Sequence, residues 1–82
     1  METEKTVDLH GMQVQEAKRY IERYLMALPS SVMQVRVIHG GNGQNPLALM
    51  VRKIKSPRLS RRILTMNPGE TLLLLKNQKE GK

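Results

Sequence analysis

The spacing of apolar residues along the chain switches between a period of two and a period of three to four. In "KTVDL", residues 5–9, apolar and polar side chains alternate, as they do on a half-buried β-strand. From Val14 to Leu28 the apolar residues instead recur every three or four positions, as on one face of an α-helix. Alternation returns in "MQVRVIH", residues 33–39. The pattern therefore predicts a strand, a helix and a second strand, in that order.

The second half of the chain predicts one more helix and two more strands. Asn45 followed by Pro46 is a favourable helix start, with Asn as the N-cap and Pro in the first helical position. The helix would end before Ser56-Pro57, because the residue before a proline avoids helical backbone angles. The two strands are predicted at "RRILTM", residues 61–66, and "TLLLLK", residues 71–76, with "NPGE" as the turn between them.

The element order β-α-β-α-β-β indicates an α/β fold. Strand-helix-strand units place their strands parallel, with a right-handed crossover. Two helices cannot cover both faces of four strands, so we expect a two-layer α/β sandwich with a four-stranded mixed sheet and both helices on one face. The segment 72–75 is apolar on both faces, which is typical of an interior strand. The uncovered face would expose Ile38 and part of this leucine run, so the chain is expected to be a monomer or a weak homodimer.

Length and composition limit the class of protein. The 82 residues predict a single domain, 1–82, with a core at about 6–76 and a disordered tail at 77–82. The absence of cysteine excludes disulfides and thiol chemistry. No apolar run approaches the roughly 20 residues of a membrane span, and no signal peptide opens the sequence. A membrane partner is therefore not expected, and a cytoplasmic location is the default expectation.

Charge is the most informative bulk property. Fourteen Lys and Arg residues oppose seven acids, which gives a net charge of +7 and an isoelectric point near 10.3. This balance favours a polyanionic partner, either nucleic acid or an acidic protein surface. Tyr20 and Tyr24 are the only aromatic residues of the chain, and this scarcity argues against recognition by an aromatic base-stacking platform.

Both histidines of the chain stand in the same context. His10 and His39 each precede a glycine at the end of a predicted strand. If the two strands are parallel, both corners lie at the sheet edge where open α/β sheets place their sites. Asp8 points to the same side of its strand as His10, and a carboxylate can orient an imidazole or help bind a metal. A single His-Gly pair is usually only a turn, and Asp-x-His is a common tripeptide, so the interpretation depends on their conjunction.

The glycine-rich segment "GGNG", residues 40–43, follows the second histidine and leads into the predicted helix start. Backbone N–H groups in such a loop can surround a phosphate. Taken alone, the segment is as compatible with a flexible connection as with a phosphate-binding loop. Together with the two histidine corners and the basic charge, it indicates a phosphate-binding edge.

The motifs of this chain resemble those of the Smr (small MutS-related) domain family, over about residues 6–76. "VDLHG" is similar to the family's first motif, L-D-x-H-G, and "VRVIHGGNG" resembles its second, a strand ending in H-G-x-G. "NPGETLLLL" resembles the closing glycine turn and apolar strand. The resemblance implies a fold similar to the carboxyl-terminal domain of bacterial translation initiation factor three, with strand order 1-2-4-3. It also implies nuclease activity on DNA or RNA, often with a divalent metal ion, here in a stand-alone member.

The sequence departs from the family pattern at two places. Where H-G-x-G would have its second glycine stands Asn42, with glycines at positions 41 and 43. Asn tolerates a positive φ better than most residues. Family members often carry a basic residue early in the second helix, whereas the first one here is Arg52.

These motifs define the candidate site of an endonuclease. His10 is the candidate general base, Asp8 would orient it or hold a divalent ion such as Mg or Mn, and His39 would act as acid or bind a phosphate oxygen. Backbone donors at Gly40, Gly41, Asn42 and Gly43 would contact the phosphate, and Arg36 would stabilise charge. The residues expected to hold the nucleic-acid backbone are Arg52, Lys53, Lys55, Arg58, Arg61 and Arg62. The alternatives are a non-catalytic DNA- or RNA-binding module and a protein-interaction adaptor with a basic face.

Overall fold

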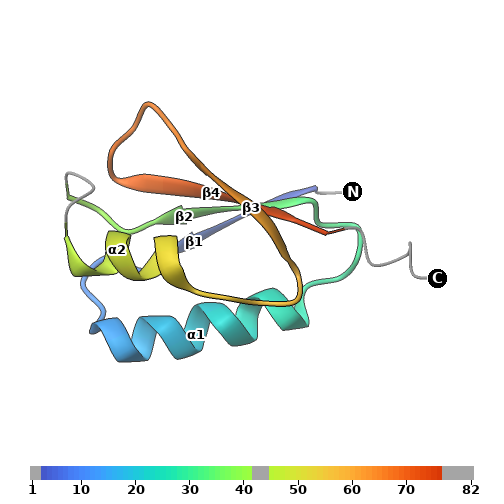
Figure 1. Ribbon diagram of the computed structural model, residues 1–82, viewed down its shortest axis with the longest axis horizontal. Helices are drawn as coiled ribbons and strands as arrows, with labels where there is room; N and C mark the ends of the chain where they lie inside the picture. The colour runs from blue at the N-terminus through green and yellow to red at the C-terminus, as the bar shows by residue number, and fades with distance from the viewer. Residues whose placement is uncertain (1–2, 42–44, 77–82) are drawn as a thin grey trace.

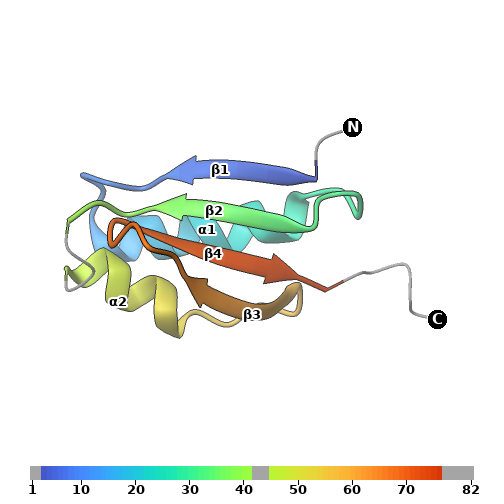
Figure 2. The same ribbon diagram turned by 90° about the horizontal axis from the view of Figure 1, so that it is seen from above.

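The computed structural model describes residues 3–41 and 45–76. It contains the predicted six elements as β1 (Glu4–Asp8), α1 (Val14–Ala27), β2 (Gln34–Ile38), α2 (Pro46–Lys53), β3 (Leu59–Leu64) and β4 (Glu70–Leu75). The sheet order is β1-β2-β4-β3, with β1 and β2 parallel and β4 antiparallel to both of its neighbours. Both helices cover the same face, and the opposite face is uncovered (Figure 1, Figure 2). The α/β sandwich with order 1-2-4-3 is thereby confirmed.

The core lies between the sheet and the helices, as the apolar patterns predict. Alternate residues of β2 and β4 are buried on the helix face, and α1 buries Ala17, Ile21 and Leu25. Helix α2 buries Leu47, Met50 and Val51, and Ile54, which follows the helix, is buried as well. On the uncovered face Ile38, Leu72 and Leu74 are only partly exposed, and the predicted weak homodimer stays a prediction.

Local chemistry explains where the helices begin and end. Asn45 caps α2, because its side-chain oxygen accepts the Ala48 N–H at 2.8 Å. The helix then starts with Pro46, as predicted. Helix α1 ends at Ala27, one residue earlier than its apolar pattern, because Leu28 precedes Pro29 and adopts extended angles (φ −72°, ψ 143°).

The third strand differs most from its prediction, since it spans Leu59–Leu64 instead of 61–66. Residues 65–66, the carboxyl end of the predicted strand, belong to a turn instead. In this turn the Thr65 hydroxyl accepts the Asn67 N–H at 3.1 Å, and the Asn67 side-chain oxygen accepts the Gly69 N–H at 2.8 Å. Its near end is longer because pairing with β4 continues to Leu75, through a register shift between Leu59 and Arg61. Short side-chain bonds in the turn therefore override the apolar pattern at residues 65–66.

Candidate functional site

The carboxyl ends of β1 and β2 and the amino ends of both helices meet at one end of the molecule, on the left of Figure 1. This end holds a pocket of about 500 Å³, which we call the edge pocket. Its described lining comes from the β1–α1 connection and the first residue of α1 (residues 10–14), the segment after β2 (39–41) and the N-cap and start of α2 (45–47). The two His-Gly corners therefore meet, as the sequence predicts.

His10 and Asp8 form an exposed pair at the rim of the edge pocket. The Asp8 carboxylate accepts the backbone N–H of His10 at 3.0 Å and lies 2.8 Å from its ring nitrogen Nδ1. Because an ionised carboxylate can only accept, Nδ1 carries the proton and Nε2 is left with a lone pair in the neutral ring. The bonds from the His10 ring and from its backbone N–H lower the pKa of Asp8. The pair therefore presents an oriented imidazole nitrogen to solvent.

His39 occupies a different environment from His10. Its side chain is buried, with 2% of its surface exposed. Nε2 lies 2.9 Å from the Thr71 hydroxyl and Nδ1 lies 3.3 Å from the Gly40 carbonyl oxygen. Since a carbonyl can only accept, Nδ1–H donates to Gly40 and Nε2 accepts from Thr71. Both ring nitrogens are thus used within the chain, and His39 positions the start of the glycine loop.

The glycine loop is held against its neighbours by backbone and side-chain contacts. Gly40 and Gly41 have φ values of +75° and +73°, a conformation that side chains rarely adopt. A Cβ on Gly41 would collide with the Asn45 amide, which itself donates to the Gly40 carbonyl at 2.7 Å. The Gly69 carbonyl accepts the N–H groups of both His39 and Gly40 at 2.9 Å. The close approach of these segments therefore requires glycine at the loop.

The contacts also decide which backbone donors remain for a ligand. The Gly40 N–H is used by Gly69. Within the described residues, the N–H groups of Gly41 and Leu47 have no acceptor, and both residues line the edge pocket. Leu47 lies in the first turn of α2, where the helix dipole favours an anion. The expected donors Asn42 and Gly43 lie outside the described residues.

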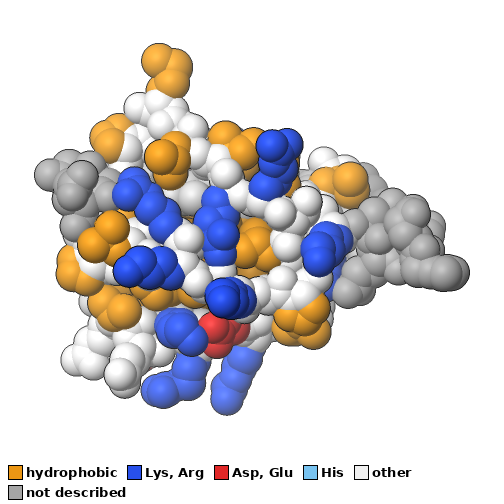
Figure 3. Space-filling view, viewed as in Figure 1, with side chains coloured by type: hydrophobic (Ala, Val, Ile, Leu, Met, Phe, Trp, Pro, Cys, Tyr) orange, Lys and Arg blue, Asp and Glu red, His pale blue; other side chains and the backbone are white. Residues whose placement is uncertain are grey.

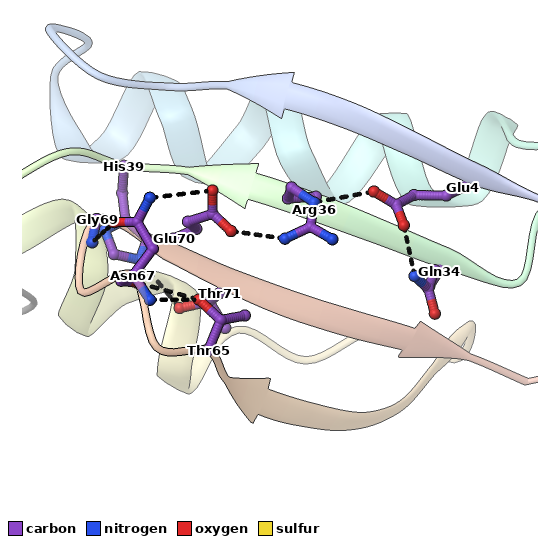
Figure 4. Close-up of polar contacts among 9 residues, drawn as sticks. All are labelled: Glu4, Gln34, Arg36, His39, Thr65, Asn67, Gly69, Glu70 and Thr71. Atoms are coloured by element: carbon purple, nitrogen blue, oxygen red, sulfur yellow. Dashed lines mark hydrogen bonds and ion pairs between the residues drawn. The ribbon is translucent and has the colours of Figure 1, made fainter.

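Arg36 lies outside the edge pocket, in an ion-pair network on the uncovered face of the sheet (Figure 4). Its guanidinium donates to Glu4 at 2.9 Å and to Glu70 at 2.6 Å, so it joins the three strands β1, β2 and β4. Gln34 donates to the second Glu4 oxygen at 2.6 Å. Arg36 therefore supports the sheet, and its charge is already paired with two carboxylates.

This network predicts a dependence of stability on acid pH. The bonds from Arg36 and then Gln34 lower the pKa of Glu4 below its ordinary value of 4.5. The unfolded chain therefore binds a proton more readily, and the stabilisation is present above about pH 4.5 and is lost as the pH falls below it. We expect the melting temperature to fall from about pH 6 to about pH 3, and Arg36→Met to reduce that slope. Parallel curves for the two proteins, measured by circular dichroism, would contradict this role for Arg36.

Comparison with known protein families matches the Smr domain over residues 7–71. The chain belongs to the Smr domain family. This family is associated with nucleic-acid binding and nicking. No curated protein sequence and no solved structure matches the chain. The family match covers both His-Gly corners and most of the sheet, and the resemblance read from the motifs is confirmed.

Two of the arginines expected to hold nucleic acid instead cap helices in this Smr domain. Arg58 is 1% exposed, and its guanidinium donates to the carbonyl oxygens of Leu25 at 2.8 Å and Leu28 at 2.7 Å, at the end of α1. Arg62 donates to the carbonyls of Val51 and Ile54, at the end of α2. The last carbonyls of a helix lack partners within the helix, so both arginines satisfy a structural need. Their guanidinium groups are therefore engaged with the ends of the two helices.

The remaining basic residues are distributed unevenly over the Smr domain. The uncovered sheet face carries three carboxylates (Glu4, Asp8 and Glu70) and two arginines (Arg36 and Arg61). Figure 3 shows Lys and Arg side chains spread over the side formed by α1, α2 and β3, with little acidic surface among them. Among the cations of the two helices and the segment after α2, Lys18, Arg19, Arg23, Lys53 and Lys55 are exposed and Arg52 is partly exposed. Lys53, Lys55 and Arg61 are exposed, as expected for backbone contacts.

The side chains of the edge pocket do not form a metal site by themselves. Among the described residues no group of three His, Asp or Glu side chains is close enough to hold an ion. Glu4 and Glu70 are paired with Arg36, which leaves the Asp8 carboxylate, itself bonded to His10. A divalent cation bound by protein alone needs more oxygen ligands than this. The donor set therefore does not fit a preformed magnesium or manganese site.

None of the helices formed by residues 3–41 and 45–76 is both long and apolar enough to cross a bilayer.

The structure also identifies site residues that the sequence patterns do not single out. Thr71 fixes the His39 tautomer, Gly69 holds the backbone of the glycine loop, and the Asn45 amide ties that loop to α2. Asn45 is recognisable as an N-cap, but its second bond depends on how the loop turns back. Gly69 is recognisable as the glycine of the turn in "NPGETLLLL", but its bonds to the glycine loop, like the bond of Thr71 to His39, depend on the pairing of β4 beside β2.

Proposed function

We propose that this Smr domain binds nucleic acid and hydrolyses a phosphodiester bond at the edge pocket, with His10 as the general base. The observation that carries the proposal is the exposed His10 ring, held by Asp8 through Nδ1 beside a pocket with unused backbone donors. Hydrolysis needs a base that activates water and donors that stabilise the charge on the phosphate. A histidine oriented by a carboxylate supplies the base, and the nearby N–H groups supply the donors.

Each group has a defined part in the reaction. His10 Nε2 takes a proton from a water molecule, whose oxygen adds to phosphorus. The bond from phosphorus to the leaving sugar oxygen breaks, and that oxygen takes a proton from solvent, which reaches the exposed site freely. The N–H groups of Gly41 and Leu47, with the start of α2, stabilise the charge on the phosphate oxygens. Asp8 holds the tautomer of His10 and stabilises the imidazolium as it forms.

A nucleic-acid-binding module without catalysis is the second candidate. One observation favours it: His39 is buried and uses both ring nitrogens within the chain, so His10 is the one histidine exposed to a ligand. A site with a base and no second titratable side chain to protonate the leaving group is a weaker catalyst than a paired acid and base.

Incubation with supercoiled plasmid and with structured RNA, each with and without Mg or Mn, distinguishes the two candidates. Hydrolysis predicts nicked plasmid or shortened RNA that accumulates with time. Binding by purified protein without any product on these substrates would favour the non-catalytic module. Absence of binding would contradict both and favour the adaptor.

The exposed cations predict the salt dependence of binding. We expect the combined substitution of Lys53, Lys55 and Arg61 by Gln to flatten the plot of log affinity against log salt by about 0.9 for each duplex-DNA phosphate that is no longer neutralised. Lys18→Gln is a matched control, since the Lys18 ammonium already pairs with Glu22 at 2.8 Å. Fluorescence anisotropy at several salt concentrations measures both slopes. An unchanged slope in the triple variant would place the nucleic-acid-binding surface elsewhere.

A further inference from the structure

The two tyrosines of the chain lie together on the surface of α1. Their ring centroids are 6.0 Å apart with an interplanar angle of 24°, so the rings are stacked. Tyr24 packs against the core, whereas 46% of the Tyr20 surface is exposed. Aromatic rings gain more from burial than most side chains do, yet this chain has no other aromatic residue and leaves both rings at its surface.

The rings border a hollow with unpaired cations. A surface pocket of about 450 Å³ is lined by both tyrosines together with Glu16, Arg19, Arg23 and Ala27. Among the described residues, neither Arg19 nor Arg23 forms an ion pair or a side-chain hydrogen bond. Ala27 contributes only a methyl group, which leaves space beside Tyr24. The hollow thus combines a ring face with two free guanidinium groups against one carboxylate.

Against the expectation from the scarcity of aromatic residues, we infer that the Tyr20–Tyr24 pair is a stacking platform for an unpaired nucleobase, with Arg19 and Arg23 holding the adjoining phosphates. This inference rests on the proposed nucleic-acid binding and adds the form of the ligand, a single-stranded segment. The rings are too close to admit a base between them, since each stacking contact takes about 3.4 Å, so the base lies on the outer face of Tyr20. Guanidinium groups and ring faces are the usual partners of single strands.

The place of the platform agrees with a strand that leaves the edge pocket. Tyr20 follows Val14, which lines that pocket, by six positions, so the rise between them along the axis of α1 is about 9 Å. A nucleic-acid strand covers this axial rise in about three nucleotides at a rise of 3.4 Å each, and further nucleotides pass around the helix, because Val14 and Tyr20 lie on different sides of α1. Bases inside a duplex are already stacked and paired, so the platform favours single-stranded over double-stranded ligand next to the pocket.

The composition of the chain offers a direct test. Tyr20 and Tyr24 are its only fluorescent side chains, so intrinsic fluorescence reports on this surface alone. The full chain is titrated with oligothymidylate and with an abasic oligomer of equal length and charge, with correction for light absorbed by the bases. We expect thymine to quench the tyrosines and to bind about fivefold or more tightly than the abasic strand.

Substitutions of Tyr20 distinguish the loss of its ring from a loss of folding. Tyr20→Leu keeps an apolar side chain and should lose the preference for bases, whereas Tyr20→Phe keeps the ring and should retain it. The melting temperature of each variant confirms that it is folded. Binding of oligothymidylate without quenching, or with equal affinity in Tyr20→Leu, would overturn the platform and leave the proposed function intact. Failure of every strand to bind would instead overturn the proposed function, and the platform with it.

Discussion

His10→Ala should lower the single-turnover rate of phosphodiester cleavage at least ~100-fold, the scale on which a positioned general base acts. The side chain lies at the rim of the edge pocket with Nδ1 bonded to Asp8, so its loss removes the proposed proton acceptor and nothing in the core. Affinity should change by less than about 1 kcal/mol, because docking depends on the cations and backbone donors. Cleavage at saturating protein and binding to an uncleavable substrate are measured separately.

Substitutions of Asp8 divide its role into orientation and charge. Asp8→Ala removes both and should also reduce the rate at least ~100-fold. Asp8→Asn keeps an oxygen that can accept from His10 and removes the negative charge, so an intermediate rate is expected. If the two residues act as one unit, the Asp8→Ala, His10→Ala double variant should be little worse than either single variant. Full cleavage by His10→Ala would remove this histidine from the chemistry.

The different surroundings of the two histidines show what a sequence motif can and cannot predict. Both His-Gly pairs follow a strand, and the meeting of the two corners was predictable from parallel strands. However, β1 is an edge strand, so His10 lies at the rim, whereas β2 is paired on both sides and His39 is covered by Thr71. Burial of the second histidine therefore depends on the insertion of β4 beside β2, a contact between residues far apart in the chain. The spacing of the two motifs does not indicate this contact.

The helices and strands were predictable because their signals are local in the sequence. Each helix and strand has an apolar period within its own residues, and Asn45-Pro46 carries its own capping chemistry. The largest displacement is in β3, where the Thr65 and Asn67 side chains form the turn, while β1 and β4 each begin one residue before their predicted start. The structural partners of the cations depend on long-range contacts: the acceptors of Arg58 lie about 30 residues away, and Arg36 finds its partners on two other strands. Charge in a sequence predicts a partner of opposite charge and not which partner it is.

Arg58→Met should produce the largest loss of stability among the substitutions considered. The Arg58 guanidinium makes two short bonds to the carbonyls of Leu25 and Leu28, and Met leaves these buried acceptors without a donor. Each such bond contributes about 1.5–3 kcal/mol. The variant also removes a buried charge whose Nε lacks a partner, and this offsets part of the loss. We therefore expect the free energy of unfolding to fall by about 2–4 kcal/mol, which corresponds to a decrease of about 10–25 °C in melting temperature.

Arg61→Gln is the matched control for Arg58→Met, since Arg61 is exposed on the edge strand three residues away and should change stability by no more than about 0.5 kcal/mol. Arg58→Lys should recover part of the loss, because an ammonium offers donors but not the planar fork that reaches both carbonyls. Thermal unfolding of the four proteins gives the ranking.

The same variants also distinguish capping from nucleic-acid contact. At a temperature where the variant is folded, Arg58→Met should bind DNA with the wild-type salt slope. The substitution removes only a guanidinium that is bonded to the end of α1. A stable Arg58→Met protein with a flattened salt slope would return Arg58 to the nucleic-acid interface.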